Sequence, residues 1–214
     1  MHCCCAEACG AARFFSRFAR RYRKRYLKKG FEPSQKQLIE GLDQAGIAGA
    51  TLLEIGCGVG YLHQHLLKSG AACAVGVDLS EKMLDEARAL AAEQGLAGRV
   101  DYRVGDFVDL AAGLAEADVT LLDKVVCCYP DAEALVNRSL ARTRRVYALT
   151  YPRDRMLNRI GVALTRFALW LVRSPFRNYV HDPKTIESWI EAAGFDRRYE
   201  NQTFVWLTQV YVRA

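Results

Sequence analysis

The sequence predicts an α/β fold, a doubly wound and mostly parallel sheet of seven strands with an antiparallel hairpin at one edge. From about residue 51 onward, short segments rich in β-branched residues alternate with helical patterns, and this alternation is typical of a parallel sheet. The chain has 214 residues, of which 51% are hydrophobic, enough for one core but not for two ordinary domains. We therefore expect one α/β domain, residues 31–214, preceded by a distinct segment, residues 1–30.

The expected strands are short and evenly distributed. They cover residues 51–55, 72–77, 100–104, 119–122 and 146–150, and the final pair, 196–200 and 204–212, would form the edge hairpin. Helical patterns lie between or after them at residues 61–69, 80–94, 107–116, 131–142 and 183–193.

One long helical pattern interrupts the alternation. Residues 154–173 form a helical insertion where a short connection would suffice, and the whole insertion covers about residues 154–182. On a helical wheel one face is apolar, formed by Leu157, Ile160, Leu164, Phe167, Ala168 and Leu171, and arginines line the other. We expect an amphipathic lid whose apolar face packs on the core and whose arginines are solvated. Peripheral attachment to acidic lipid is the alternative.

Positive charge is concentrated near the N-terminus. Residues 13–29 hold nine Lys or Arg, Glu7 is the single acid before residue 30, and residues 30–214 carry a net charge of −2. A nearly neutral body argues against a nucleic-acid partner. Phe14, Phe18, Tyr22 and Tyr26 recur at every fourth residue, which predicts one aromatic-faced basic helix over residues 13–29 that ends at Gly30.

The eight cysteines lack the regular spacing of a disulfide framework. Reduced thiols and a cytoplasmic location are expected, with neither a signal peptide nor a membrane-spanning segment. His2, Cys3, Cys4, Cys5 and Cys9 do not have the paired spacing of a structural zinc site, so no metal site is assigned. This cluster is either an unstructured terminus or a trap for a soft metal or metalloid.

The most informative motif runs from Leu53 to Gly60, LEIGCGVG, where a strand leads into a glycine turn that opens a helix. Glycines in such a turn let the backbone approach a ligand closely. A dinucleotide-binding fingerprint would place another glycine at position 61, but this chain has Tyr61, and Glu54 precedes the first glycine. A nicotinamide-dependent oxidoreductase is therefore disfavoured.

This motif resembles the first motif of the class I methyltransferases, which use S-adenosylmethionine and release S-adenosylhomocysteine. Asp78 ends the second strand where that family places the carboxylate that accepts the ribose hydroxyls. Asp106 follows the third strand, where the family has an acid near the adenine amino group beside an apolar residue. The resemblance implies a Rossmann-like fold and these cofactor-binding residues: Glu54, Gly56, Cys57, Gly58, Gly60, Tyr61, Asp78, Leu79, Gly105, Asp106 and Phe107.

A narrower resemblance lies at the end of the fourth strand. Residues 121–130, LLDKVVCCYP, are similar to the L-D-x-x-I-H-Y-P segment of magnesium-protoporphyrin O-methyltransferases, with Cys128 where that family has a histidine. In the wider family this loop borders the transferred methyl group, so Asp123, Cys128 and Tyr129 are candidates for the acceptor wall or for catalysis. His181 follows the insertion and could accept a proton, because histidine titrates near neutral pH.

Together these features predict an enzyme that methylates a small or amphiphilic acceptor. The basic segments suggest an anionic acceptor, and the N-terminal cysteines suggest a soft acceptor such as a thiol or metalloid. The alternative is a noncatalytic protein of the same fold that binds a metal or a lipid surface. Sequence alone leaves the oligomeric state and the methylated atom open.

Overall fold

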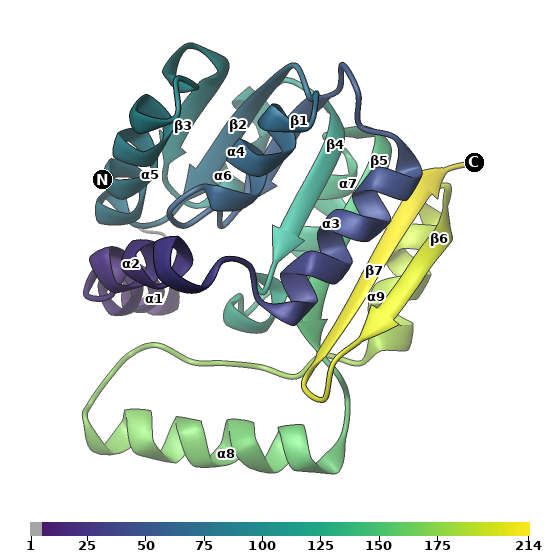
Figure 1. Ribbon diagram of the computed structural model, residues 1–214. Helices are drawn as coiled ribbons and strands as arrows, with labels where there is room; N and C mark the ends of the chain where they lie inside the picture. The colour runs from purple at the N-terminus through teal and green to yellow at the C-terminus, as the bar shows by residue number, and fades with distance from the viewer. Residues whose placement is uncertain (1–5) are drawn as a thin grey trace.

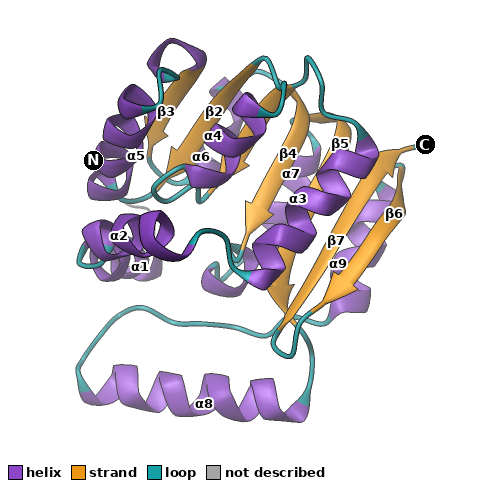
Figure 2. Ribbon diagram, in the orientation of Figure 1, coloured by secondary structure: helices purple, strands orange, loops and turns teal. Residues whose placement is uncertain are grey.

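A seven-stranded sheet forms the centre of the molecule in the computed structural model, which describes residues 6–214 and side chains from residue 10 onward (Figures 1 and 2). The strand order is β3-β2-β1-β4-β5-β7-β6. The strands are β1 (Thr51–Ile55), β2 (Cys73–Asp78), β3 (Val100–Val104), β4 (Ala117–Asp123), β5 (Thr143–Pro152), β6 (Phe195–Gln202) and β7 (Trp206–Arg213).

The predicted fold class is confirmed. Strands β1 to β5 pair in parallel, whereas β7 pairs antiparallel with both β5 and β6 at one edge of the sheet. After β3 the chain returns to the other side of β1 to form β4. This reversal leaves a crevice at the carboxyl ends of β1 and β4, where ligands bind in open α/β sheets.

Helices cover both faces of the sheet (Figure 2). One face carries α3 (Pro33–Ala45), α4 (Tyr61–Lys68) and α5 (Glu81–Glu93), and the other carries α6 (Phe107–Leu110), α7 (Ala132–Leu140) and α9 (Pro183–Ala192). Successive side chains of β5 point to opposite faces of the sheet. Tyr147 and Leu149 therefore belong to one apolar cluster, and Val146 and Ala148 belong to the other.

Helix α3 was absent from the sequence prediction, although its signals are local. Pro33 occupies the first turn, and Glu32 and Gln35 form a reciprocal capping box. Leu38 and Leu42 are fully buried one turn apart and belong to the cluster that also contains Val146 and Val210. The helix therefore supports the antiparallel edge and brings Gln35 towards the end of β4.

The basic segment forms two helices, α1 (Ala6–Ser16) and α2 (Ala19–Lys29), in place of the single predicted helix. The break lies at Phe18, whose φ and ψ are −111° and 1°. It allows the aromatic residues to pack on two surfaces: Phe14 stacks on Phe176, whereas Tyr22 packs near Val59. We call α1 and α2 the arm.

The insertion forms helix α8 (Met156–Leu171), but the predicted orientation of this helix is wrong. It lies beside the molecule rather than on the sheet (Figure 1), and the residues expected to pack on the core are exposed: Leu157, Ile160, Leu164, Phe167, Ala168 and Leu171. The opposite side holds it in place, since Leu169 is buried in a small cluster with Ala11 and Phe176. Within residues 6–214, no helix has the length and apolar character needed to cross a bilayer.

Candidate active site

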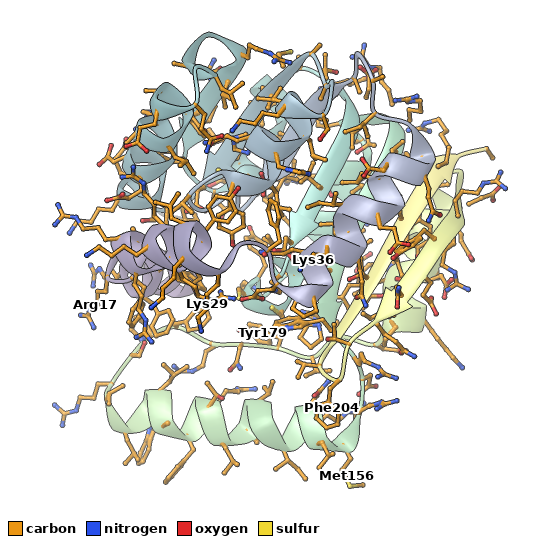
Figure 3. The ribbon with its side chains drawn as sticks, in the orientation of Figure 1. Arg17, Lys29, Lys36, Met156, Tyr179 and Phe204 are labelled. Carbon is orange, nitrogen blue, oxygen red and sulfur yellow. The ribbon has the colours of Figure 1, made fainter. Side chains whose placement is uncertain are left out.

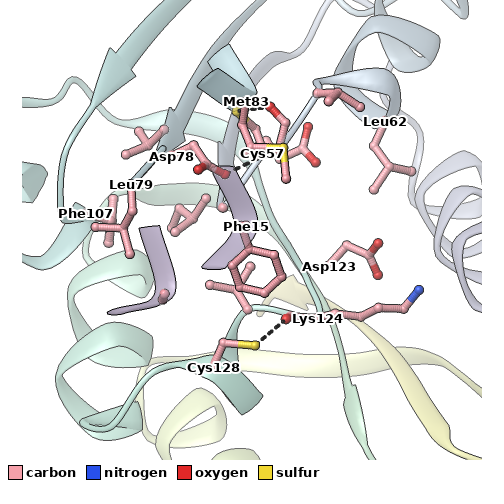
Figure 4. Close-up of a pocket in the computed structure, with 18 of the residues that line it drawn as sticks. Phe15, Cys57, Leu62, Asp78, Leu79, Met83, Phe107, Asp123, Lys124 and Cys128 are labelled. Atoms are coloured by element: carbon pink, nitrogen blue, oxygen red, sulfur yellow. Dashed lines mark hydrogen bonds between the residues drawn. The ribbon is translucent and has the colours of Figure 1, made fainter. Parts of the chain in front are cut away.

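A cavity of about 380 Å³ opens at the carboxyl ends of β1, β2 and β4, beneath the arm (Figure 4). Its wall combines the glycine turn after β1, the ends of β2 and β3, the loop after β4, and side chains of the arm and α3. Segments more than 100 residues apart in sequence therefore meet in one chamber.

The glycine turn needs its glycines for two different reasons. Gly56, Gly58 and Gly60 all have positive φ, at 64°, 54° and 75°, which residues with a Cβ rarely adopt. A Cβ on Gly56 would lie 2.5 Å from Cγ2 of Val125, whereas a Cβ on Gly58 would meet nothing within 4 Å. Gly56 thus permits packing, and Gly58 keeps part of the cavity wall free of side chains. Gly60 precedes α4 and does not line the cavity.

Asp78 is fixed by backbone amides at the end of β2. Its Oδ2 accepts from the Gly58 N–H and its Oδ1 from the Ser80 N–H, both at 2.8 Å. Burial in the cavity wall raises the pKa of Asp78 to about 6, although the two amide hydrogen bonds oppose this shift. The carboxylate is therefore oriented before any ligand arrives.

The next two predicted donor-site residues contribute buried contacts. Glu54 Oε2 lies 2.5 Å from His63 Nδ1 and also accepts the His63 backbone N–H at 3.2 Å. His63 is fully buried, and its Nε2 lies 3.0 Å from the Tyr102 hydroxyl. Burial raises the pKa of the Cys57 thiol well above its usual range, so Cys57 remains protonated. Both Glu54 and Cys57 also line the cavity.

Asp106 and Tyr129 form a second fixed pair. The Tyr129 hydroxyl donates to Oδ1 and Oδ2 of Asp106 at 2.9 and 3.0 Å, and Oδ1 also accepts the Val108 N–H that begins α6. Asp106 therefore caps a helix and faces the cavity at the same time. Three neighbours complete this part of the wall: Leu79, Gly105 and Phe107.

Asp123 lies at the end of β4, and only one of its two carboxylate oxygens has a hydrogen-bond partner among the described residues. Gln35 Nε2 donates to Asp123 Oδ2 at 2.8 Å and to the Tyr61 hydroxyl at 3.0 Å. Asp123 Oδ1 is buried without a hydrogen-bond partner among residues 6–214. Burial raises the pKa of Asp123, while Lys124 and the Gln35 hydrogen bond oppose the rise. An orphaned carboxylate oxygen in a cavity wall is suited to receive a polar group of a ligand.

Charges on this side of the cavity are balanced. Glu32 pairs with both Lys124 and Arg25, and the Lys124 ammonium lies 5.0 Å from the centre of the Trp206 ring. Sequence reasoning missed Arg25, Glu32, Gln35 and Trp206 as wall residues. The capping box marks Glu32 and Gln35 as a helix start, but no sequence pattern indicates that this start faces β4.

Cys128 lines the cavity and His181 does not. The Cys127 and Cys128 sulfurs lie 3.6 Å apart within the loop after β4. His181 Nε2 lies 3.1 Å from the Val126 carbonyl oxygen, and burial lowers its pKa. The structure therefore places His181 outside the cavity lining, where it contacts the loop after β4 at Val126, next to Cys127.

No group of three or more His, Cys, Asp or Glu side chains in the described part of the chain is arranged to hold a metal. The N-terminal cluster, His2 with Cys3, Cys4, Cys5 and Cys9, lies outside the residues whose side chains are described.

Comparison with known proteins shows that the chain is similar to methyltransferases. The sequence profile described as "Methyltransferase domain" matches residues 52–147. The ubiquinone biosynthesis O-methyltransferase of Aromatoleum aromaticum is 30% identical over 174 residues, which are 78% of this chain and 73% of that protein. The ribosomal protein L11 methyltransferase of Edwardsiella ictaluri is 31% identical over 117 residues, 51% of this chain and only 40% of that protein.

Solved structures agree on the fold. The magnesium protoporphyrin IX methyltransferase of Synechocystis PCC 6803, crystallised with S-adenosylhomocysteine, superimposes with a TM-score of 0.74 at 22% identity. That match covers 97% of this chain and 100% of the other. The chain belongs to the class I S-adenosylmethionine-dependent methyltransferases, and S-adenosylmethionine is the methyl donor of that class.

Proposed function

We propose that this chain methylates a small, amphiphilic acceptor held between the glycine turn and the loop after β4. One observation carries the proposal. A glycine turn with open space at Gly58 and an oriented Asp78 shares one cavity wall with Asp123, whose buried Oδ1 has no hydrogen-bond partner among the described residues. This cavity therefore has a donor half and an acceptor half.

The donor half fits S-adenosylmethionine. Asp78 would accept the ribose hydroxyls, Asp106 would face the adenine amino group, and Leu79 and Phe107 would pack on the ring. The open space at Gly58 would admit the ligand close to the backbone. The cofactor supplies a methyl group already activated on a sulfonium, so the protein mainly aligns the acceptor and excludes water.

Asp123 is the residue best placed to handle the proton of the acceptor. Its Oδ1 is unpaired among the described residues, and Gln35 holds Oδ2. In its ionised form, Asp123 Oδ1 would accept the proton of a hydroxyl, amine or thiol that is being methylated. His181 is better suited to a positioning role, because its ring lies against the Val126 carbonyl in the loop that leads to Cys128 and Tyr129.

The wall favours an acceptor with an apolar or aromatic body. Phe15, Tyr22, Tyr61 and Trp206 line the cavity, while Arg25 and Lys124 are both paired with Glu32. The arginines of α8 are not among the lining residues, so they give no reason to require an anionic acceptor. The Cys127 and Cys128 thiols make soft acceptors, including thiols and trivalent metalloids, worth testing. The cysteines described in the structure are all unpaired, which suits a reducing compartment such as the cytoplasm.

The test is release of S-adenosylhomocysteine from S-adenosylmethionine by the reduced, full-length protein with phenols, aromatic carboxylates, porphyrin carboxylates, thiols and metalloid oxyanions. One acceptor class should support turnover. Asp123→Asn should lower kcat by roughly 100-fold or more for a protic acceptor, while Asp43→Asn, which changes an exposed acid at the far end of α3, should not. Equal activity in the wild type and Asp123→Asn would remove Asp123 from the mechanism.

A further inference from the structure

The outward side of α8 presents a continuous apolar surface to solvent. Leu164, Phe167 and Leu171 are 65%, 58% and 62% exposed, and Met156, Leu157 and Ile160 continue the same side of the helix. We call these six residues the apolar face. Single exposed apolar residues are ordinary, but a contiguous row along four turns of helix indicates a surface that another body covers.

The tip of the β6–β7 hairpin extends this surface. Phe204 and Val205 are 67% and 37% exposed. The Val205 carbonyl accepts from the Arg153 backbone N–H at 2.8 Å and from Asn158 Nδ2 at 3.1 Å, so the tip is joined to the start of α8. Figure 3 shows Phe204 and Met156 at the same end of the helix, with Met156 directed away from the sheet.

The side of α8 opposite the apolar face is basic. Arg155, Arg159, Arg166 and Arg173 follow one side of α8, and residues 155–173 contain no Asp or Glu. The acid that precedes this segment, Asp154, is paired with Arg159, and Asp182 also lies close enough to act on Arg159. On the arm, Arg17 and Lys29 lie on the side towards α8 in Figure 3.

This charge pattern distinguishes between possible occupants. The core of the same chain is excluded, because Asn158 and Leu169 already turn the opposite side of α8 towards the body. A second copy packed on the apolar face would leave the arginines on the outer sides of the helix pair without neutralisation, because residues 155–173 contain no Asp or Glu to pair them. An anionic lipid surface offers both an apolar interior and negative headgroups.

We propose that α8 and the hairpin tip form an interfacial anchor for an anionic lipid bilayer. The helix lies in the plane of the surface, with the apolar face among the acyl chains and the arginines among the headgroups. Binding strength follows from the apolar area buried and from the attraction of the arginines, and the second part weakens with salt.

Vesicle flotation of the full-length protein tests the anchor. Wild type should float with vesicles of phosphatidylcholine and phosphatidylglycerol, and much less with phosphatidylcholine alone or at high salt. The double variant Leu164→Ser/Phe167→Ser should bind at least roughly tenfold more weakly. Arg155→Gln/Arg166→Gln should lose the preference for anionic vesicles. Leu27→Ser provides the matched control, since Leu27 is 60% exposed on α2 and lies outside the apolar face.

Other outcomes would overturn the anchor. Absence of flotation by folded wild type, or equal flotation of Leu164→Ser/Phe167→Ser, contradicts lipid binding by the apolar face. A dimer in sedimentation that disappears in the same variant assigns the face to a second copy. Affinity for S-adenosylmethionine should be unchanged in Leu164→Ser/Phe167→Ser, which separates failure of the anchor from failure of the active site.

Discussion

Gln35 Nε2 lies 2.8 Å from Asp123 Oδ2, and this hydrogen bond joins α3 to the end of β4 across 88 positions of sequence. The side-chain oxygen of the same residue, Gln35 Oε1, accepts a hydrogen bond from the Glu32 backbone N–H in the capping box. The helix start therefore fixes the amide orientation, and the amide fixes Oδ2 of Asp123 while Oδ1 stays without a partner among the described residues. The capping box at the start of α3 thus orients Asp123, the residue to which we assign proton acceptance.

Loss of this hydrogen bond should shift the pH dependence of turnover. Burial raises the pKa of Asp123 and the Gln35 hydrogen bond lowers it, so Gln35→Leu should raise that pKa further. Because the ionised carboxylate accepts the proton, activity falls as pH decreases through this pKa. The acidic limb of the kcat profile should therefore move to higher pH in Gln35→Leu. Gln37→Leu, in the same helix but hydrogen-bonded to Asn201 rather than to Asp123, should leave the profile unchanged; a shared profile for all three proteins would contradict this role.

Affinity for S-adenosylmethionine should depend on ionisation of Asp78. Burial raises the pKa of Asp78 to about 6, and protonation removes the negative charge and turns one acceptor position of the carboxyl into an O–H donor. The Kd should therefore increase as pH falls through about 6 and level off above it. Asp78→Ala should weaken binding by roughly 10- to 100-fold at pH 8, the loss of charge-assisted hydrogen bonds, and should remove the pH dependence. Titration at several pH values measures both effects, with Asp43→Ala as the exposed control; pH-independent wild-type binding would contradict the assignment.

Alanine substitutions at Gly58 and Gly95 distinguish the effect of backbone strain from the effect of a side chain that blocks the ligand. Both have positive φ, 54° and 70°, and a Cβ at either would meet nothing within 4 Å. Alanine at either position should cost about 1–2 kcal/mol of stability. Only Gly58→Ala should also weaken cofactor binding, because Gly58 lines the cavity and Gly95 does not. Thermal unfolding and titration of both variants check this, and equal affinities would show that the Gly58 surface does not face the ligand.

Cofactor binding should protect Cys128 from alkylation. Cys128 lines the cavity, whereas Cys73 is exposed on β2 away from it. With S-adenosylhomocysteine present, mass spectrometry should show severalfold slower maleimide labelling of Cys128 and unchanged labelling of Cys73. Protection of neither cysteine at saturating ligand would place the ligand outside this cavity.

The strand framework could be read from the sequence because its signals are local. The seven predicted strands lie within about three residues of those observed, since β-branched segments bounded by turns depend on few distant contacts. The arm is different. Its aromatic spacing predicts one helix, but Phe14 and Tyr22 pack on separate surfaces and the chain breaks at Phe18 between them. The periodicity of α8 was correct, yet periodicity does not reveal which way an apolar face turns.

In the candidate site too, one part could be predicted from local sequence motifs and the other could not. Its donor half follows from a contiguous motif and two strand ends, and most of those residues line one cavity. The acceptor half depends on contacts between distant segments, such as Gln35 with Asp123 and Lys124 with Glu32, for which the sequence carries no local signal. His181 illustrates the limit, because its residue type suggested proton transfer while its ring lies against the Val126 carbonyl.

Calorimetric titration of the reduced, full-length protein with S-adenosylmethionine tests the central claim most directly, with NADH as the comparison ligand. The account predicts saturable 1:1 binding of S-adenosylmethionine that is weakened in Asp78→Ala and Gly58→Ala, and no binding of NADH. A folded wild-type protein that binds neither S-adenosylmethionine nor S-adenosylhomocysteine would contradict the assignment of this cavity to methyl transfer.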